Sequence, residues 1–212
     1  MADLIFYTNP QSRGQTIRWM LEEVGAPYET EILDYGSTMK AEPYLSINPM
    51  GKVPAIKHKG KVVTEVAAIC CYLADAFPDA NLAPPPGERA DYYRWIFFTS
   101  GPIEAAFSNK AAGWEPTPER QRMFGYGNYD LAINNLEKGL AGREFIAADH
   151  FTAADLFVGA NVNFMLAFNL LEPRPTFIDY ARRMTDRDAY RRAKGIDARL
   201  IAEAQAQQPQ PA

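Results

Sequence analysis

The sequence predicts an α+β protein of two domains, a mixed N-terminal domain followed by an all-α C-terminal domain. Strand and helix patterns alternate over residues 1–78, a proline-rich stretch interrupts them at 79–88, and the apolar patterns of 89–212 have helical spacing. Three consecutive prolines and a glycine make 79–88 a stiff linker. We therefore expect one domain at 1–78 and a second at 89–212.

The N-terminal domain is expected to begin with a strand, a helix and a second strand. The apolar run LIFY at 4–7 is typical of a short buried strand. Apolar residues at 17, 20, 21 and 24 have helical spacing, and Gly25 is placed to end that helix. PYETEIL at 27–33 is typical of a strand. This order predicts parallel strands joined by a right-handed crossover.

A hairpin and a helix are expected to complete this domain. After a polar segment at 34–49, VPAIKH and KVVTE flank the turn signal Lys59-Gly60. Helical spacing then extends from Val66 to Phe77, and Thr64 is the expected N-cap of this helix. The predicted order is therefore strand, helix, strand, loop, strand, strand, helix.

The C-terminal residues are expected to form helices only. Apolar or aromatic stripes mark 92–107, 123–140, 156–164 and 177–184. Thr152 and Asp155 have the spacing of a capping box, which is a structural role. A cationic stretch at 182–194 is interleaved with acids, which favours a solvated helix face.

Bulk properties exclude several classes of function. The net charge of -4 argues against a nucleic-acid or membrane partner. No secretion signal or membrane-spanning run is recognised, so we expect a cytoplasmic protein. Neighbouring Cys70 and Cys71 are poorly placed to bond each other, and the only two histidines are far apart. We therefore expect no metal site and no histidine-based triad.

Three stretches favour a site for a small anionic or peptide-like ligand. In FYTNPQSRGQTIRW (6–19) a strand passes into a helix through a polar bend that contains Ser12 and Arg13. In NPMGKVPAI (48–56), a cis Val53-Pro54 bond would present the Val53 backbone at a sheet edge to a peptide ligand. An ordinary trans proline entering an edge strand is equally compatible with that sequence.

The third stretch, VVTEVAAICCYL (62–73), places Glu65 in the first turn of a helix. The helix N-terminus would bind a carboxylate, and Glu65 would bind an ammonium group on the same ligand. By itself, this stretch is better explained as a capped helix with a favourably placed glutamate.

Taken together, these stretches and FTAADLFV (151–158) resemble the cytosolic glutathione S-transferase family in order and approximate spacing. The resemblance spans nearly the whole chain, and its class within the family is open. It implies a thioredoxin-like N-terminal domain, an all-α C-terminal domain and a homodimer. It also implies that glutathione is a co-substrate.

The resemblance assigns glutathione contacts residue by residue. The backbone of Val53, before a cis Pro54, would pair with the cysteinyl part, and Lys52 would lie near the glycyl carboxylate. Glu65 and Val66 would hold the γ-glutamyl end. The family usually has Ser or Thr where this chain has Val66, so one hydroxyl donor is missing. The assignment also takes in Gln11, at the family's cysteine position, and Arg13, which supports the loop or adds positive potential.

The implied chemistry is attack by the glutathione thiolate on a small hydrophobic electrophile, with a detoxification role. Tyr7 and Ser12 compete as the hydroxyl that stabilises the thiolate, with Tyr7 slightly favoured, and Asn9 is a third candidate. The alternatives are packing for Tyr7 and an N-cap for Ser12. The electrophile is expected between the domains, against Ile103, Phe107, Trp114 and Phe164, although aromatic residues at helical spacing are more often core.

Two other classes of function stay open. One is another glutathione-dependent enzyme on the same fold, such as an isomerase, dehalogenase or peroxidase. The other is a non-enzymatic protein that binds glutathione or apolar ligands.

Overall fold

The computed structural model describes residues 3–206, which form two compact units. The first unit comprises the described residues up to Ala80 and those from Arg187 onward, and the second comprises Asn81–Asp186. The domain boundary predicted at 79–88 lies where the chain passes between the units, in short 3₁₀ turns at Pro78–Ala80 and Pro86–Glu88.

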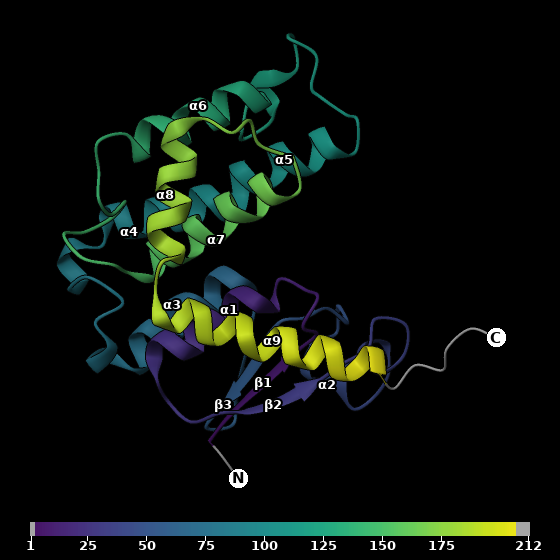
Figure 1. The fold of residues 1–212 in the computed structure, drawn as a ribbon. Helices are drawn as coiled ribbons and strands as arrows, with labels where there is room; N and C mark the ends of the chain where they lie inside the picture. Colours follow the sequence, from purple (N-terminus) through teal and green to yellow (C-terminus); the bar gives the residue numbers. More distant parts are fainter. Residues whose placement is uncertain (1–2, 207–212) are drawn as a thin grey trace. The chain divides into compact units, whose positions relative to one another are not determined.

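A four-stranded mixed sheet is the centre of the first unit (Figure 1). Its order is β2-β1-β3-β4, with β1 and β2 parallel and the other pairs antiparallel. The strands are β1 (Leu4–Thr8), β2 (Glu29–Ile32), β3 (Ala55–His58) and β4 (Lys61–Thr64). The strand order along the chain and the parallel first pair are as the sequence predicts, although each strand is short.

Helices cover both faces of this sheet because neighbouring residues of a strand point to opposite faces. On one face, Tyr7 and Ala55 pack against Met39 and Tyr44 of the segment that contains α2 (Tyr44–Ile47). On the other face lie α1 (Gly14–Val24) and α3 (Val66–Ala76), which contact each other. The left-handed Gly25 ends α1, as predicted from its position.

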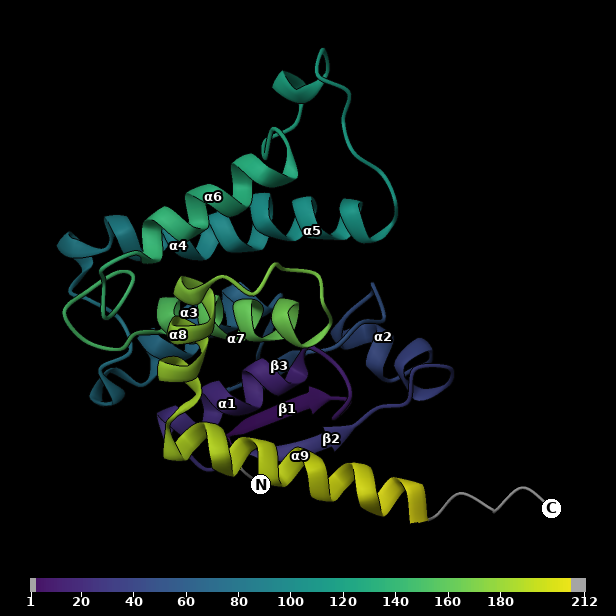
Figure 2. The same ribbon diagram turned by 45° about the horizontal axis from the view of Figure 1, so that its top comes forward.

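Five helices make up most of the second unit: α4 (Ala90–Phe98), α5 (Glu104–Ala111), α6 (Tyr129–Leu140), α7 (Ala153–Ala167) and α8 (Pro175–Thr185). A π-helical segment at Thr99–Ile103 joins α4 to α5, and α6 runs beside them (Figure 2). Gly139 of α6 is required for close packing, because a Cβ there would lie 2.0 Å from the Trp95 ring. The predicted capping box of Thr152 and Asp155 is present at the start of α7.

The last helix, α9 (Asp188–Ala206), packs along α1 and so belongs to the first unit rather than to the second (Figure 1). The expected C-terminal domain at 89–212 included this helix, because its residues follow the other helices directly in sequence. Its buried anchor is an ion pair between Arg18 Nε and Asp197 Oδ1 at 2.6 Å, with both side chains almost fully buried.

The prediction of a solvated cationic face over 182–194 is wrong for part of that stretch. Arg187 binds both carboxylate oxygens of Glu23, and Arg192 binds Glu22. Lys194 donates to Gln15. These cations therefore connect α9 and the residue just before it to α1, which residue order alone could not reveal.

Within residues 3–206, no helix is long and apolar enough to cross a membrane. The same residues contain no group of three or more His, Cys, Asp or Glu side chains placed to hold a metal ion. Cys70 and Cys71 form no disulfide bond within these residues.

Candidate functional site

One end of the sheet gathers the segments that the sequence analysis singled out. Tyr7 of β1 pairs with Ala55 of β3, and Ala55 pairs with Thr64 of β4. The end of β1, the start of β3 and the end of β4 therefore lie at one level of the sheet. Three segments adjoin these strand ends: the loop into α1 follows β1, the Val53-Pro54 bond precedes β3, and the start of α3 follows β4.

The loop at residues 9–13 is held by its own side chains. The Asn9 amide donates to the Leu33 carbonyl at 2.9 Å, and its oxygen accepts from the Gln11 backbone at 3.0 Å. The Ser12 hydroxyl donates to the Asn9 carbonyl at 2.7 Å and accepts from the Gly14 backbone at 2.9 Å. The side chains of Asn9 and Ser12 therefore stabilise the conformation of this loop through hydrogen bonds to its backbone and to Leu33.

Gly14 allows α1 to begin directly against the end of β1. A Cβ at this position would lie 1.9 Å from the Thr8 hydroxyl oxygen. The residues before it, Ser12 and Arg13, are half-buried, and Gln11 is exposed. The loop therefore brings a helix N-terminus, a hydroxyl and a cation to the same end of the sheet.

Tyr7 lies in the apolar cluster between the sheet and α2. Its ring centroid is 5.6 Å from that of Tyr44, and Val53 packs against the same cluster. Burial, together with the negative charge of Glu31, raises the pKa of the Tyr7 phenol, so the phenol stays protonated. Among residues 3–206, its hydroxyl has no hydrogen-bond partner. It is therefore an uncommitted donor.

The Val53-Pro54 peptide bond is cis, which confirms one of the two alternatives left by the sequence. The carbonyl of the preceding Lys52 accepts hydrogen bonds from the Tyr44 hydroxyl at 2.5 Å and the Asn48 amide at 2.8 Å. The backbone N–H and C=O of Val53 make no hydrogen bond within the described part of the chain. They are available to pair with an extended ligand.

The expectation that the Val53 backbone lies at an edge of the sheet is wrong, because the strand that follows it, β3, is flanked by β1 and β4. Val53 is open because it precedes the paired part of β3. Sequence reasoning also missed Tyr44 and Asn48, which fix the carbonyl before Val53. The dipeptide Asn48-Pro49 was a turn signal, but nothing in the sequence indicated the partner of its side chain.

Glu65 has an unusual backbone at the start of α3. Its φ is 68°, a conformation that costs a non-glycine residue about 1–3 kcal/mol. Thr64 does not cap the helix, contrary to expectation, because it ends β4 and Glu65 occupies the N-cap position without a side-chain cap bond. The N–H groups of the first turn therefore remain open to a ligand.

Two side chains of opposite charge, Glu65 and Lys52, belong to the segments at this end of the sheet and do not form an ion pair with each other. Glu65 and Lys52 are both exposed, and neither side chain forms an ion pair within residues 3–206. Val66, the first residue of α3, is half-buried and offers its backbone N–H only. This arrangement can bind an ammonium group at Glu65 and carboxylates at the helix start and at Lys52.

The four residues predicted for an electrophile all lie in the second unit. Ile103 and Phe107 are buried, and the Phe107 and Phe164 ring centroids are 6.4 Å apart. Trp114 is 42% exposed, and its ring contacts Phe124 with centroids 5.1 Å apart. Ile103 is fully buried, so it behaves as a core residue, whereas Trp114 offers its ring to solvent.

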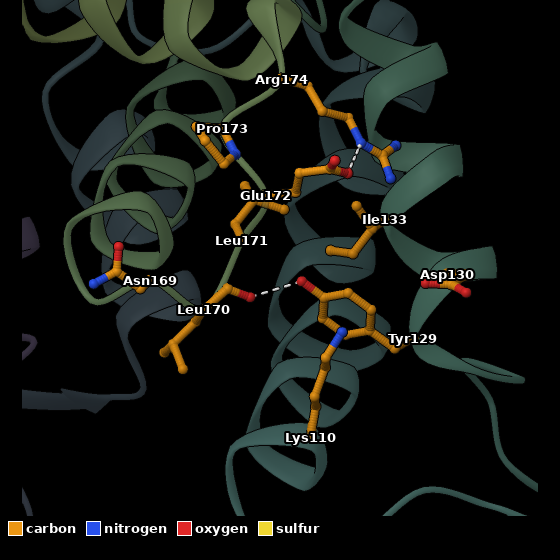
Figure 3. A pocket seen from close by; sticks show the side chains of 10 residues that line it. All are labelled: Lys110, Tyr129, Asp130, Ile133, Asn169, Leu170, Leu171, Glu172, Pro173 and Arg174. Carbon is orange, nitrogen blue, oxygen red and sulfur yellow. Dashed lines mark hydrogen bonds and ion pairs between the residues drawn. The ribbon is translucent and has the colours of Figure 1, made fainter.

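A cavity of about 420 Å³ in the second unit offers less chemistry (Figure 3). The Lys110 ammonium lies 3.5 Å from the centre of the Tyr129 ring, and the Tyr129 hydroxyl donates to the Leu170 carbonyl at 2.6 Å. Arg174 is occupied by Glu137 and Glu172, each at 2.7–2.8 Å. Because its polar groups bind each other, this cavity is a weaker candidate than the end of the sheet.

Known proteins are similar to this chain in sequence and in fold. Residues 12–76 match the family model "Glutathione S-transferase, N-terminal domain". Protein LigF from Sphingobium sp. is 28% identical, with 76% of each chain covered. Glutathione S-transferase GstA from Escherichia coli O157:H7 is 27% identical, over 68% of this chain and 73% of that protein.

Solved structures of glutathione transferases are also similar to this chain. A glutathione transferase from Methylococcus capsulatus is 26% identical and superposes with a TM-score of 0.75, covering 92% of this chain and 98% of its own. A Sulfitobacter homologue with bound glutathione is 21% identical and shares the fold with a TM-score of 0.73, covering 92% of this chain and 99% of its own. The predicted fold class, a thioredoxin-like N-terminal sheet with a helical C-terminal part, is thus confirmed. Residues 12–76 of this chain therefore match the N-terminal domain of the glutathione S-transferase family, and the chain is similar to glutathione S-transferases in sequence and in fold.

Proposed function

We propose that this protein is a glutathione transferase that joins the glutathione sulfur to small hydrophobic electrophiles. One observation carries the proposal: the open Val53 backbone, the open start of α3 and the unpaired charges of Glu65 and Lys52 gather at one end of the sheet. Glutathione is a peptide with one ammonium group and two carboxylates. Its polar groups are complementary to this set.

Each part of glutathione has a proposed partner. The cysteinyl backbone pairs with Val53, as an added strand pairs with an open backbone. The γ-glutamyl carboxylate accepts from the N–H groups at the start of α3, and its ammonium group binds Glu65. The glycyl carboxylate lies near Lys52. The positive φ of Glu65 supports this assignment, since strained backbone of this kind clusters at ligand sites.

Activation of the thiol requires a group that prefers the thiolate. A free thiol has a pKa of about 8.5, and lowering it to about 6.5 takes about 2.7 kcal/mol. One well-aimed hydroxyl donor and nearby helix N–H groups are of this size. We assign the donor role to Tyr7 ahead of Ser12 and Asn9, because the Ser12 hydroxyl proton is already donated to the Asn9 carbonyl and the Asn9 amide already binds the Leu33 carbonyl.

The reaction forms a bond between the glutathione sulfur and an electrophilic carbon. The thiol proton leaves to solvent on activation, and the electrophile either loses a leaving group with its electron pair or takes up a proton after addition. Phe107, Phe164 and Trp114 are the proposed apolar contacts of the electrophile, with Ile103 supporting them from the core. Within the same proposal, the protein acts as a cytoplasmic homodimer in detoxification.

A non-enzymatic glutathione-binding protein is the second candidate. Val66 supplies no hydroxyl to the γ-glutamyl carboxylate, and the Ser12 hydroxyl is occupied. Both observations favour binding without strong activation. Turnover with a panel of electrophiles distinguishes the two candidates.

Calorimetric titration with glutathione tests the site itself. We expect Glu65→Gln to weaken binding by about tenfold, the loss of one charge-assisted contact. Asp79→Asn is the matched control, because Asp79 is an exposed acid in the turn after α3, away from the start of that helix. Equal affinities of wild type and Glu65→Gln would contradict the assignment.

A further inference from the structure

A chain of two side chains connects α9 to the loop at residues 9–13. The Gln15 amide nitrogen donates to the Pro10 carbonyl at 2.6 Å. The Lys194 ammonium donates to the Gln15 amide oxygen at 2.9 Å. We propose that Gln15 and Lys194 are positioning residues, which hold this loop in the geometry needed to stabilise the glutathione thiolate. The catalytic consequence rests on the proposed function.

Both ends of the Gln15 amide are used, and this fixes its orientation. An ammonium can only donate and a carbonyl can only accept, so the amide oxygen must face Lys194 and its nitrogen must face Pro10. A charged donor at one end polarises the amide and strengthens the bond that it donates at the other end. The charge of Lys194 therefore acts on the Pro10 carbonyl through Gln15.

The loop borders a cavity on the side that faces α9, although Asn9 and Pro10 are themselves buried. A cavity of about 350 Å³ lies between Asn9, Pro10 and Gln11 on one side and the α9 residues Leu200, Ile201, Ala204 and Gln205 on the other. Ile32 and Asp34 complete its wall. Proline has no backbone N–H, so the carbonyl is the only backbone polar group by which residue 10 can be held. The hydrogen bond from Gln15 therefore adds to the burial of Asn9 and Pro10 in setting the position of the loop.

Lys194 is itself held in place by the anchoring of its helix. The ion pair of Arg18 and Asp197 is buried one turn further along α9. Arg187 and Arg192 bind acids of α1 at the other side of Lys194. Arg192 supplies a matched control, because it is an exposed cation of the same helix that reaches Glu22 but does not reach the loop.

The first experiment needs no ligand. Amide hydrogen exchange is measured for Gln11 and Ser12, whose N–H groups bond to Asn9 within the loop. We expect exchange about fivefold faster in Gln15→Leu and in Lys194→Met, from more frequent local opening. Lys194→Arg should restore wild-type exchange, and Arg192→Met should leave it unchanged. Equal exchange in wild type, Gln15→Leu and Lys194→Met would overturn the proposal.

The second experiment measures thiolate formation. The ultraviolet band of the bound thiolate is recorded at pH 7, and S-methylglutathione, which has no ionisable thiol, is titrated in parallel. We expect the thiolate fraction to fall about threefold in Gln15→Leu and Lys194→Met, while the affinity for S-methylglutathione stays within about twofold of wild type. An unchanged thiolate fraction, or an equal fall in Arg192→Met, would overturn the positioning role.

Failure of the proposed function gives a different result. A wild-type protein that binds neither glutathione nor S-methylglutathione contradicts the proposed function. The exchange experiment still decides whether Lys194 and Gln15 hold the loop, because it uses the protein alone. A purely structural role of Lys194 would lower the thermal stability of Lys194→Met and of Arg192→Met alike without a selective effect on Gln11 and Ser12.

Discussion

Val66 allows a direct test of how this chain binds the γ-glutamyl end of glutathione. The change Val66→Thr adds one hydroxyl at nearly constant shape, at the first residue of α3. The backbone N–H groups of that helix start are already available for the γ-glutamyl carboxylate. The added hydroxyl would donate one more hydrogen bond to the same carboxylate.

The expected gain follows from the exposure of the position. A hydrogen bond to a charged group contributes about 1.5–3 kcal/mol, and exposure to water reduces this value. Val66 is half-buried rather than buried, so the lower end applies. We therefore expect about 1.4 kcal/mol, which is about a tenfold tighter binding of glutathione.

Calorimetric titration of wild type and Val66→Thr with glutathione measures this gain. Val62→Thr is the control for the substitution itself, since Val62 is an exposed residue of β4. Cysteinylglycine, which lacks the γ-glutamyl group, should bind Val66→Thr and wild type equally. Unchanged glutathione affinity, or an equal gain for cysteinylglycine, would refute the placement of the γ-glutamyl carboxylate at the start of α3.

Three further predictions concern the first unit. Asp197→Asn should lower the free energy of unfolding in urea by about 3 kcal/mol, because it leaves the buried Arg18 charge uncompensated. The double variant Arg18→Met, Asp197→Leu should recover most of this loss, and no recovery would contradict the explanation. Burial lowers the pKa of His58, so the free energy of unfolding should fall as the pH drops below about 6.5, where the unfolded chain binds more protons than the folded one. Urea unfolding at pH 7.5 and 5.5 should show a smaller fall for His58→Gln than for wild type, and an equal fall would argue against this origin. Gly14→Ala should destabilise the protein by about 2 kcal/mol through its clash with Thr8, and Thr8→Ala should relieve part of it in urea unfolding; full additivity of the two changes would exclude the clash.

Most of the sheet could be predicted from the sequence because its signals are local. Alternation and turn residues indicated β3 and β4 with the turn Lys59-Gly60 between them, and the strands end within a few residues of the prediction. The placement of α9 could not be predicted. It depends on the contact between Arg18 and Asp197, which are far apart in sequence. A helical spacing indicates a buried face but not the element that covers it.

The candidate site divides in the same way. Glu65, Lys52 and the cis bond before Pro54 were indicated by a short motif and by the resemblance that it carries. The supporting side chains were not indicated, because their roles depend on distant partners. Gln15 was one polar residue on a helix until its bonds to Pro10 and Lys194 were known.

The ultraviolet difference spectrum of bound glutathione, recorded against pH, tests whether this site activates the glutathione thiol. We expect a thiolate band in wild type that titrates well below the pKa of about 8.5 of a free thiol. Tyr7→Phe should return the titration toward that value, and Ser12→Ala should have a smaller effect. Glutathione that binds without such a band would contradict the claim that this site activates the thiol.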